Sequence, residues 1–194
     1  MATCDLKALK AAANAVAKKS THPALNKILL KGVKVAATDS YICFEADNGA
    51  SVNECFENEG WLFNAEAFAK AKTSERKNDS ATFELCSISE DCAESTWQVT
   101  FNGVTTLMKA ESGARFPKYK DLFKKYGAFA QLKPTPSFGF DSTLMEKCLK
   151  CLKVKGGKGA TVKAVFNGEL SPCVMYLGAE LSTRVLLMPC KVEV

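Results

Sequence analysis

The chain contains nearly the same phrase twice: Val99-Thr100-Phe101-Asn102-Gly103 and Ala164-Val165-Phe166-Asn167-Gly168. Each phrase ends one strand-like run of residues and is followed by another. An Asn-Gly pair between two such runs predicts a tight hairpin, because both residues tolerate a positive φ angle. Each copy also follows a segment that enters a helical pattern from a phenylalanine, Phe63 or Phe140. The chain is therefore predicted to consist of repeated helix and hairpin units that pack against one another.

Three helical patterns alternate with groups of strand-like runs. Apolar residues at helical spacing, such as Leu6, Leu9 and Val16, predict helices that each bury one side. The helical patterns span about 5–19, 64–76 and 141–156; the strand-like runs span 28–30, 33–37, 41–46, 81–86, 97–101, 104–110, 160–166, 173–177 and 183–189. The predicted fold is α+β, with three strand-helix-strand repeats that form a layer of antiparallel sheet and a layer of helices.

Composition restricts the class of protein. Apolar residues at 47% and charged residues at 24% are ordinary for a globular protein, and no apolar run reaches the roughly 18 residues that span a bilayer. The N-terminus lacks the basic and apolar regions of a signal peptide. We therefore expect a soluble, cytoplasmic protein with no membrane partner.

The nine cysteines are scattered, and several lie in apolar runs, so they are expected to act as small hydrophobic residues in a reducing compartment. Cys148 and Cys151 have the spacing of half a zinc site, but no second Cys or His pair lies nearby, and the only histidine, His22, precedes a proline. No nucleophile, base and orienting group can be assembled from the sequence. We expect no metal, no cofactor and no enzymatic activity.

Lysines gather on the predicted helices, in a chain whose formal net charge is +5. They follow helical spacing in the first and third patterns and lie toward the end of the second. Such lysines are candidates for phosphate contacts, although the solvated faces of ordinary amphipathic helices and helix C-termini also carry them. The candidate DNA-binding residues are Lys7, Lys10, Asn14, Lys18, Lys70, Lys77, Lys147, Lys150 and Lys153. Four of them, Lys7, Lys10, Lys147 and Lys150, are expected on solvated faces.

Three motifs, in this order along the chain, resemble those of bacterial sliding clamps, the DNA polymerase III beta subunits. The first is Ser20-Thr-His-Pro-Ala-Leu-Asn-Lys-Ile-Leu-Leu30 followed by Val35-Ala-Ala-Thr-Asp-Ser-Tyr41. The second, Arg115-Phe-Pro-Lys-Tyr119, resembles the segment that ends a clamp domain, and the third, Leu187-Met-Pro-Cys-Lys-Val192, resembles the clamp C-terminus. The match extends over nearly the whole chain.

The resemblance implies a DNA-clamp-like arrangement, with sheets outside and helices on an inner face toward duplex DNA. Since clamp domains contain two repeats each, it implies a complete domain at 1–118, a linker at 119–133 that leads into the stiff stretch Lys133-Pro-Thr-Pro136, and a half domain at 134–194. A closed ring of roughly twelve repeats would need four chains, so a homo-oligomer, possibly a tetramer, is expected.

The resemblance also implies a cleft in which a DNA polymerase or another replication protein inserts a short apolar peptide. Its predicted walls are Thr38, Ser40, Tyr41, Ile42, Phe116, Pro117, Leu186 and Met188, with Asp39 in the same turn. The leading hypothesis is thus a processivity factor that encircles or cradles DNA and tethers a polymerase. The alternatives are a clamp-like decoy or regulator of replication that does not bind DNA, and a small-molecule enzyme on the same scaffold.

Overall fold

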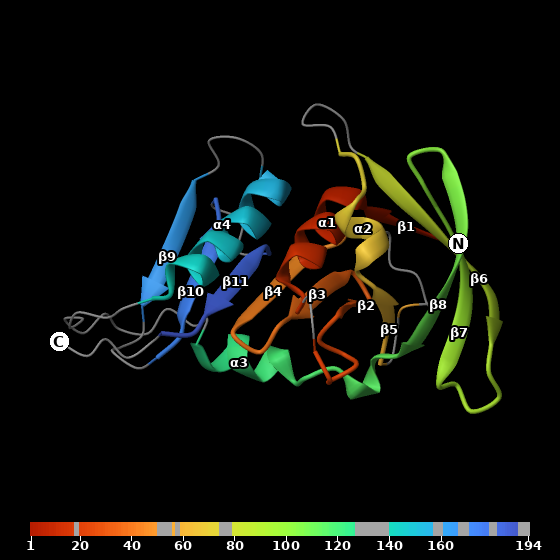
Figure 1. Cartoon of the computed structure of the whole chain (residues 1–194), viewed down its shortest axis with the longest axis horizontal. Helices are drawn as coiled ribbons and strands as arrows, with labels where there is room; N and C mark the ends of the chain where they lie inside the picture. The colour runs from red at the N-terminus through yellow and green to blue at the C-terminus, as the bar shows by residue number, and fades with distance from the viewer. Residues whose placement is uncertain are drawn as a thin grey trace.

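The computed structural model describes residues 1–17, 20–49, 56, 59–73, 79–126, 140–156, 161–166, 171–178 and 182–189. In this part of the chain, eleven strands form one antiparallel sheet, in the order β1-β6-β7-β8-β5-β2-β3-β4-β11-β10-β9 (Figure 1). The strands are β1 (Ala2–Asp5), β2 (Lys27–Lys31), β3 (Lys34–Thr38), β4 (Ile42–Asp47), β5 (Trp61–Asn64), β6 (Ser80–Ile88), β7 (Glu94–Phe101), β8 (Val104–Ser112), β9 (Val162–Phe166), β10 (Cys173–Leu177) and β11 (Arg184–Leu187).

The sheet is built from repeats, as the sequence predicts. The helices are α1 (Leu6–Ala15), α2 (Glu66–Ala69), α3 (Tyr119–Tyr126) and α4 (Ser142–Gly156). The first two repeats are β1-α1-β2-β3-β4 and β5-α2-β6-β7-β8, and they exchange their first strands: β1 pairs with β6, and β5 pairs with β2. The third repeat, α4-β9-β10-β11, joins the sheet where β11 pairs with β4. The predicted α+β class with three repeats is confirmed.

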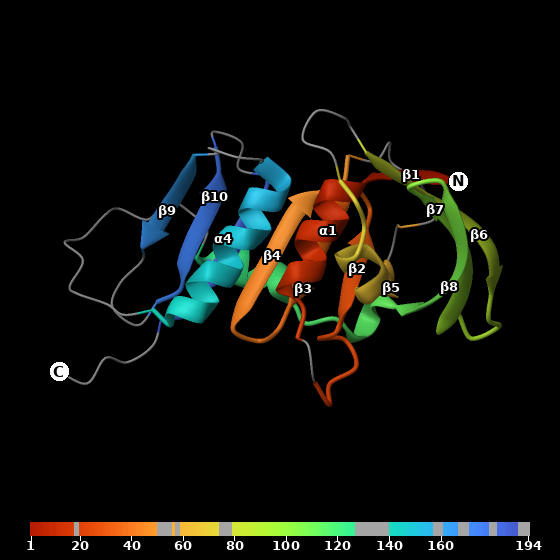
Figure 2. The same ribbon diagram turned by 45° about the horizontal axis from the view of Figure 1, so that its top comes forward.

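Helices α1, α2 and α4 lie on one side of the sheet, called here the helical face, and α3 lies on the other. Helices α1 and α4 are neighbours on the helical face (Figure 2). Side-chain caps fix where they begin: an Asp5 side-chain oxygen accepts from the Lys7 N–H at 2.8 Å, and an Asp141 oxygen accepts from the Thr143 N–H at 2.8 Å. The second side of the sheet is here called the α3 face.

Each face of the sheet has its own apolar core. On the helical face the core includes Leu9, Phe83, Trp97 and Cys148, all with no exposed surface. On the α3 face a smaller core holds Phe123, which is 1% exposed, together with residues of β2, β4 and β11. Alternation along the strands supplies both cores: in β4, Phe44 lies in the helical-face core and Cys43 in the other.

The hairpin predicted at Asn102-Gly103 is confirmed. Both residues have positive φ angles, 52° and 76°, and they connect β7 to β8 with Phe101 opposite Val104. The second copy, Asn167-Gly168, lies outside the described residues.

Two helix predictions were too long. The first helix ends at Ala15 rather than near Lys19, and the second has four residues, Glu66–Ala69, instead of the predicted 64–76. A short helix needs a packed apolar face to persist, and Phe68 is the only buried residue of α2. None of the helices in the described ranges is long and apolar enough to cross a membrane.

The segment 119–133, predicted to be a linker, begins with a helix. Helix α3 buries Tyr119 and Phe123 against the sheet. Residues 119–126 of the predicted linker are therefore part of the packed fold. Residues 127–139, which include the predicted stiff stretch 133–136, lie outside the described residues. The division into a whole and a half domain stays a prediction.

Candidate nucleic-acid interface and partner cleft

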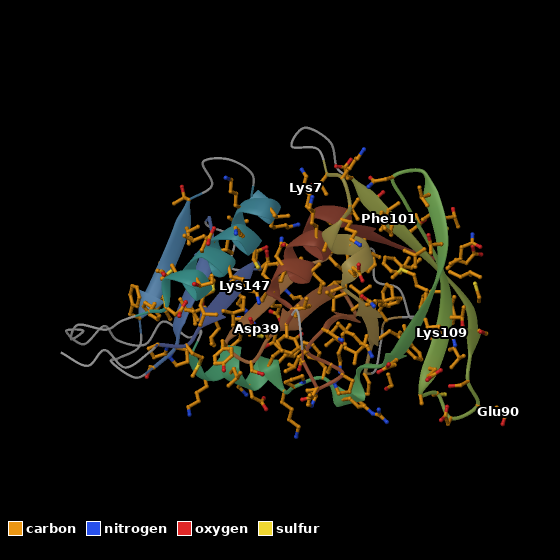
Figure 3. The ribbon with its side chains drawn as sticks, viewed as in Figure 1. Lys7, Asp39, Glu90, Phe101, Lys109 and Lys147 are labelled. Atoms are coloured by element: carbon orange, nitrogen blue, oxygen red, sulfur yellow. The ribbon has the colours of Figure 1, made fainter. Side chains whose placement is uncertain are left out.

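The repeats bring the candidate DNA-binding side chains of three helices to one face. Lys7, Lys10 and Asn14 belong to α1, Lys70 directly follows α2, and the lysines at 147, 150 and 153 belong to α4. Figure 3 shows Lys7 and Lys147 on the two helices that are neighbours on this face. Lys18 and Lys77 lie outside the described residues.

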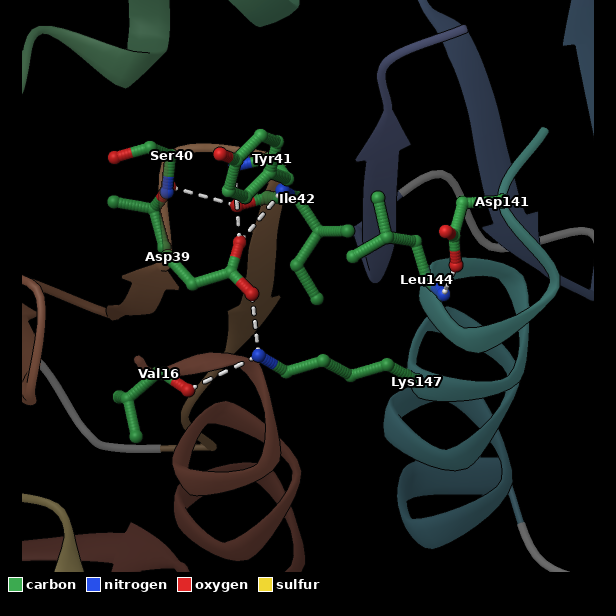
Figure 4. Close-up of polar contacts among 9 residues, drawn as sticks. Val16, Asp39, Ser40, Tyr41, Ile42, Asp141, Leu144 and Lys147 are labelled. Atoms are coloured by element: carbon green, nitrogen blue, oxygen red, sulfur yellow. Dashed lines mark hydrogen bonds and ion pairs between the residues drawn. The ribbon is translucent and has the colours of Figure 1, made fainter. Parts of the chain in front are cut away.

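Two of these lysines connect parts of the fold. Lys10 Nζ donates to the Ala71 carbonyl oxygen at 2.7 Å, which connects α1 to the segment after α2. Lys147 Nζ donates to the Val16 carbonyl oxygen at 3.1 Å, just after α1, and forms an ion pair with the Asp39 carboxylate (Figure 4). The expectation that both lie on solvated faces was wrong. Each side chain is only partly exposed, and its ammonium group donates hydrogen bonds to acceptors within the fold.

Three other lysines are well exposed on the helical face. Lys70 is paired with Glu66 at 2.6 Å and Lys150 with Glu146 at 2.9 Å, each over one helical turn. The Lys70 hydrogen bond lowers the pKa of the Glu66 carboxyl. Exposed pairs of this kind contribute little to stability, so their lysines can turn to a phosphate at small energetic cost. Lys153 is exposed and forms no ion pair with any described residue.

The fold brings two of the predicted cleft residues, Tyr41 and Met188, next to each other. Pairing of β4 with β11 places Ile42 opposite Leu187, and the Met188 N–H donates to the Tyr41 carbonyl oxygen at 3.3 Å. Tyr41 and Met188 are both exposed, at 62% and 40%, although they are far apart in the sequence. The two residues therefore form an exposed apolar pair at the junction of the first and third repeats.

A hydrogen-bonded turn fixes the backbone beside this pair. Asp39 Oδ1 accepts from the N–H groups of Tyr41 at 3.0 Å and Ile42 at 2.9 Å, and Thr38 Oγ1 donates to the Ile42 carbonyl oxygen at 2.7 Å (Figure 4). Ser40 has a φ of 81°, a conformation that such a turn requires. Lys147 holds the second oxygen of Asp39, so the turn is tied to α4.

Other predicted walls are not part of the exposed pair. Ile42 packs into the helical-face core, whereas Leu186 and Phe116 are buried in the core of the α3 face. Pro117 is exposed and lines a cavity of about 290 Å³ together with Leu29 and Phe116, and none of residues 38–42 or 186–188 lines that cavity.

Two charged features of the structure were not predicted from the sequence. One is the pairing of Lys147 with Asp39, which no local pattern encodes. The other is a group of cations on the α3 face that includes Lys120 and Lys124. Their spacing of four residues, with aromatic residues at 119 and 123, was a signal for an amphipathic helix in the predicted linker.

The described cysteines are free, and most are buried. Burial raises the pKa of Cys151 to about 12 and that of Cys173 to about 11, which disfavours the thiolate that a metal site requires. No group of three or more potential metal ligands occurs within the described ranges.

Comparison with solved structures relates this fold to bacterial clamps. The chain superposes on a protein from Eubacterium rectale assigned as a DNA polymerase III beta subunit, with a TM-score of 0.67, 11% identity, and coverage of 100% of this chain and 66% of the other. The superposition on the Bacillus subtilis sliding clamp has a TM-score of 0.61 and 11% identity, and it covers 98% of this chain and 64% of the clamp. The superposition on the Borrelia burgdorferi DNA polymerase III beta subunit, solved in complex with a natural product, has a TM-score of 0.62 and 11% identity. It covers 100% of this chain and 63% of the beta subunit.

The chain thus has the sliding-clamp fold and spans just under two thirds of the length of these three proteins. No family model matches the sequence. No curated protein matches it either.

Proposed function

We propose that this chain, which has the fold of bacterial sliding clamps, is a non-enzymatic processivity factor that cradles duplex DNA and tethers a DNA polymerase. The observation that carries the proposal is the arrangement of α1, α2 and α4 on one face of a continuous sheet, with exposed lysines on that face. Contacts between lysines and phosphates attract duplex DNA of any sequence, and they do not fix the protein at one base sequence. Such contacts suit a protein that moves along DNA.

The test is a charge reversal on α4. We expect Lys150→Glu with Lys153→Glu to weaken duplex DNA binding about tenfold at low salt, because two phosphate contacts become repulsive. Fluorescence anisotropy of a labelled duplex measures the affinity, and circular dichroism checks the fold. The matched control is Lys109→Glu with Lys118→Glu, which makes the same charge change at exposed positions outside α1, α2 and α4. Equal weakening by both pairs would assign binding to net charge and not to the helical face.

One observation favours the alternative of a clamp-like decoy or regulator that does not bind DNA. Lys10 and Lys147 are engaged inside the fold, and the exposed Lys70 and Lys150 each have an acidic neighbour. The helical face therefore carries less free positive charge than the sequence suggests. If the parent chain shows no affinity for duplex DNA at low salt, this alternative replaces the leading proposal.

Partner attachment is proposed at the exposed Tyr41 and Met188 pair. A short apolar peptide would cover both side chains, while the Thr38-Asp39-Ser40 turn supplies a rigid polar edge that orients it. A polymerase tail of this chemistry is the proposed partner.

Self-association is proposed through the edge of β8. Residues 104–109 pair with β7 on one side, whereas on the other side β5, the only described strand that pairs there, covers β8 only at 110–112. Val104 and Leu107, near this open edge, are 60% and 67% exposed. An uncovered edge with exposed apolar side chains is a template for another strand.

Light scattering tests this association. We expect a mass in solution that is a multiple of the 21.0 kDa chain, with the tetramer as the closed-ring form. We also expect Leu107→Lys to shift the mass toward the monomer, since a buried charge opposes strand pairing. A parent chain that stays monomeric at tens of micromolar contradicts the oligomer.

A further inference from the structure

A second cavity, of about 380 Å³, opens on the α3 face and gathers cations from three elements. Its lining residues are Lys34 of β3, Glu45 of β4, Lys120 and Lys124 of α3, and Arg184 of β11. It exists because β11 pairs with β4, which places Arg184 directly opposite Glu45. None of the residues proposed to contact DNA lines it.

The carboxylate of Glu45, the one acidic residue among those that line this cavity, is neutralised by Arg184. Glu45 is 3% exposed, and Arg184 donates to its Oε1 twice, from Nε at 3.1 Å and from Nη2 at 2.8 Å. The Phe123 ring lies 4.2 Å from the guanidinium carbon, so the arginine is held between a carboxylate and an aromatic face. Lys34 is paired with Asp47 at 2.5 Å. The positive charge in excess therefore belongs to Lys120 and Lys124.

Helix α3 presents these two lysines together. They are one helical turn apart, and like charges at this spacing destabilise a helix. Burial of Tyr119 and Phe123 fixes the helix on the sheet, so that both lysines face the cavity that Arg184 and Lys34 also line. Neither lysine forms an ion pair with any residue that the structure describes. A bound anion would relieve the repulsion among them.

We propose that this cavity binds the carboxylates of an acidic segment of a partner protein. The cations converge on one concave site instead of following a line, as contacts to a nucleic-acid backbone do. They also lie on the side of the sheet opposite α1 and α4. Arg184 Nη1 makes no hydrogen bond with any described residue and can donate to an incoming carboxylate, which the two lysines would hold by charge.

The experiment uses the full chain and a short fluorescein-labelled peptide in which glutamates alternate with glycines. A matched peptide carries glutamine in place of each glutamate. We expect the glutamate peptide to bind and Lys120→Glu with Lys124→Glu to weaken its binding at least about tenfold, which corresponds to the loss of one charge-assisted contact. Lys150→Glu with Lys153→Glu is the control, since it changes net charge equally on the helical face, and we expect it to change this affinity less than about twofold.

Three results would overturn the acidic-peptide site. They are equal weakening by both double variants, equal binding of the glutamine peptide, and displacement of the glutamate peptide from the control variant by duplex DNA, which would make the cavity a nucleic-acid site. Lys120→Gln with Lys124→Gln serves as a second variant that adds no negative charge, and we expect it to retain the fold and to weaken binding by a smaller factor. Because the DNA assay depends on Lys150 and Lys153, this inference and the proposed function can fail independently.

Discussion

Replacement of Trp97 by alanine is expected to lower the free energy of unfolding by about 4 kcal/mol, because it removes a large, fully buried side chain from the helical-face core. Trp97 has no exposed surface, stacks on Phe56 with ring centroids 5.3 Å apart, and lies 5.8 Å from Phe63. Its Nε1 donates to Ser95 Oγ at 2.6 Å, so the hydroxyl also loses its partner. Urea denaturation of the full chain, followed by circular dichroism, measures the change.

The control for Trp97 is Ile88→Ala on the neighbouring strand β6. Ile88 is 45% exposed, and its truncation is expected to change the free energy of unfolding by less than about 0.5 kcal/mol. Trp97→Phe should recover part of the loss, since a smaller ring keeps the contact with Phe56. A Trp97→Ala loss as small as that of Ile88→Ala would mean that β6, β7 and β8 are not part of the cooperative core.

Lys147→Met is expected to lower the free energy of unfolding by about 3 kcal/mol, because it leaves a mostly buried carboxylate without its cation. The Asp39 side chain is 9% exposed and that of Lys147 24%, and Lys147 Nζ also caps the Val16 carbonyl oxygen at 3.1 Å. The same substitution would loosen the attachment of α4 to the Asp39 turn, and hence of the third repeat to the first. Urea denaturation measures the loss.

Lys150→Met is the matched control, since its pair with Glu146 is exposed and contributes at most about 0.5 kcal/mol. In an Asp39→Asn background, Lys147→Met should lower the free energy of unfolding by clearly less than in the parent chain, because no buried charge is left without a partner. Similar losses for Lys147→Met and Lys150→Met in the parent chain would show that the pair with Asp39 does not hold the two repeats together.

Local sequence patterns predicted the features that depend on neighbouring residues. The strand predicted at 173–177 has the same bounds in the structure, and the Asn102-Gly103 turn forms where it was expected. Hairpin turns follow from the φ angles that a residue tolerates, and strands and helices follow from the spacing of apolar residues. Three repeats of one kind could therefore be read from the chain before their packing was known.

Contacts between residues far apart in the sequence set how the repeats join and which charges are free. The pairing of β4 with β11 connects residues about 140 positions apart, and it creates both the Tyr41 and Met188 pair and the cavity that contains Arg184. Lys147 and Lys150 look alike in the sequence, yet one faces a mostly buried carboxylate and the other faces solvent. The amphipathic pattern of a helix records which side is polar, whereas the partner of each polar group depends on long-range contacts that local spacing does not encode.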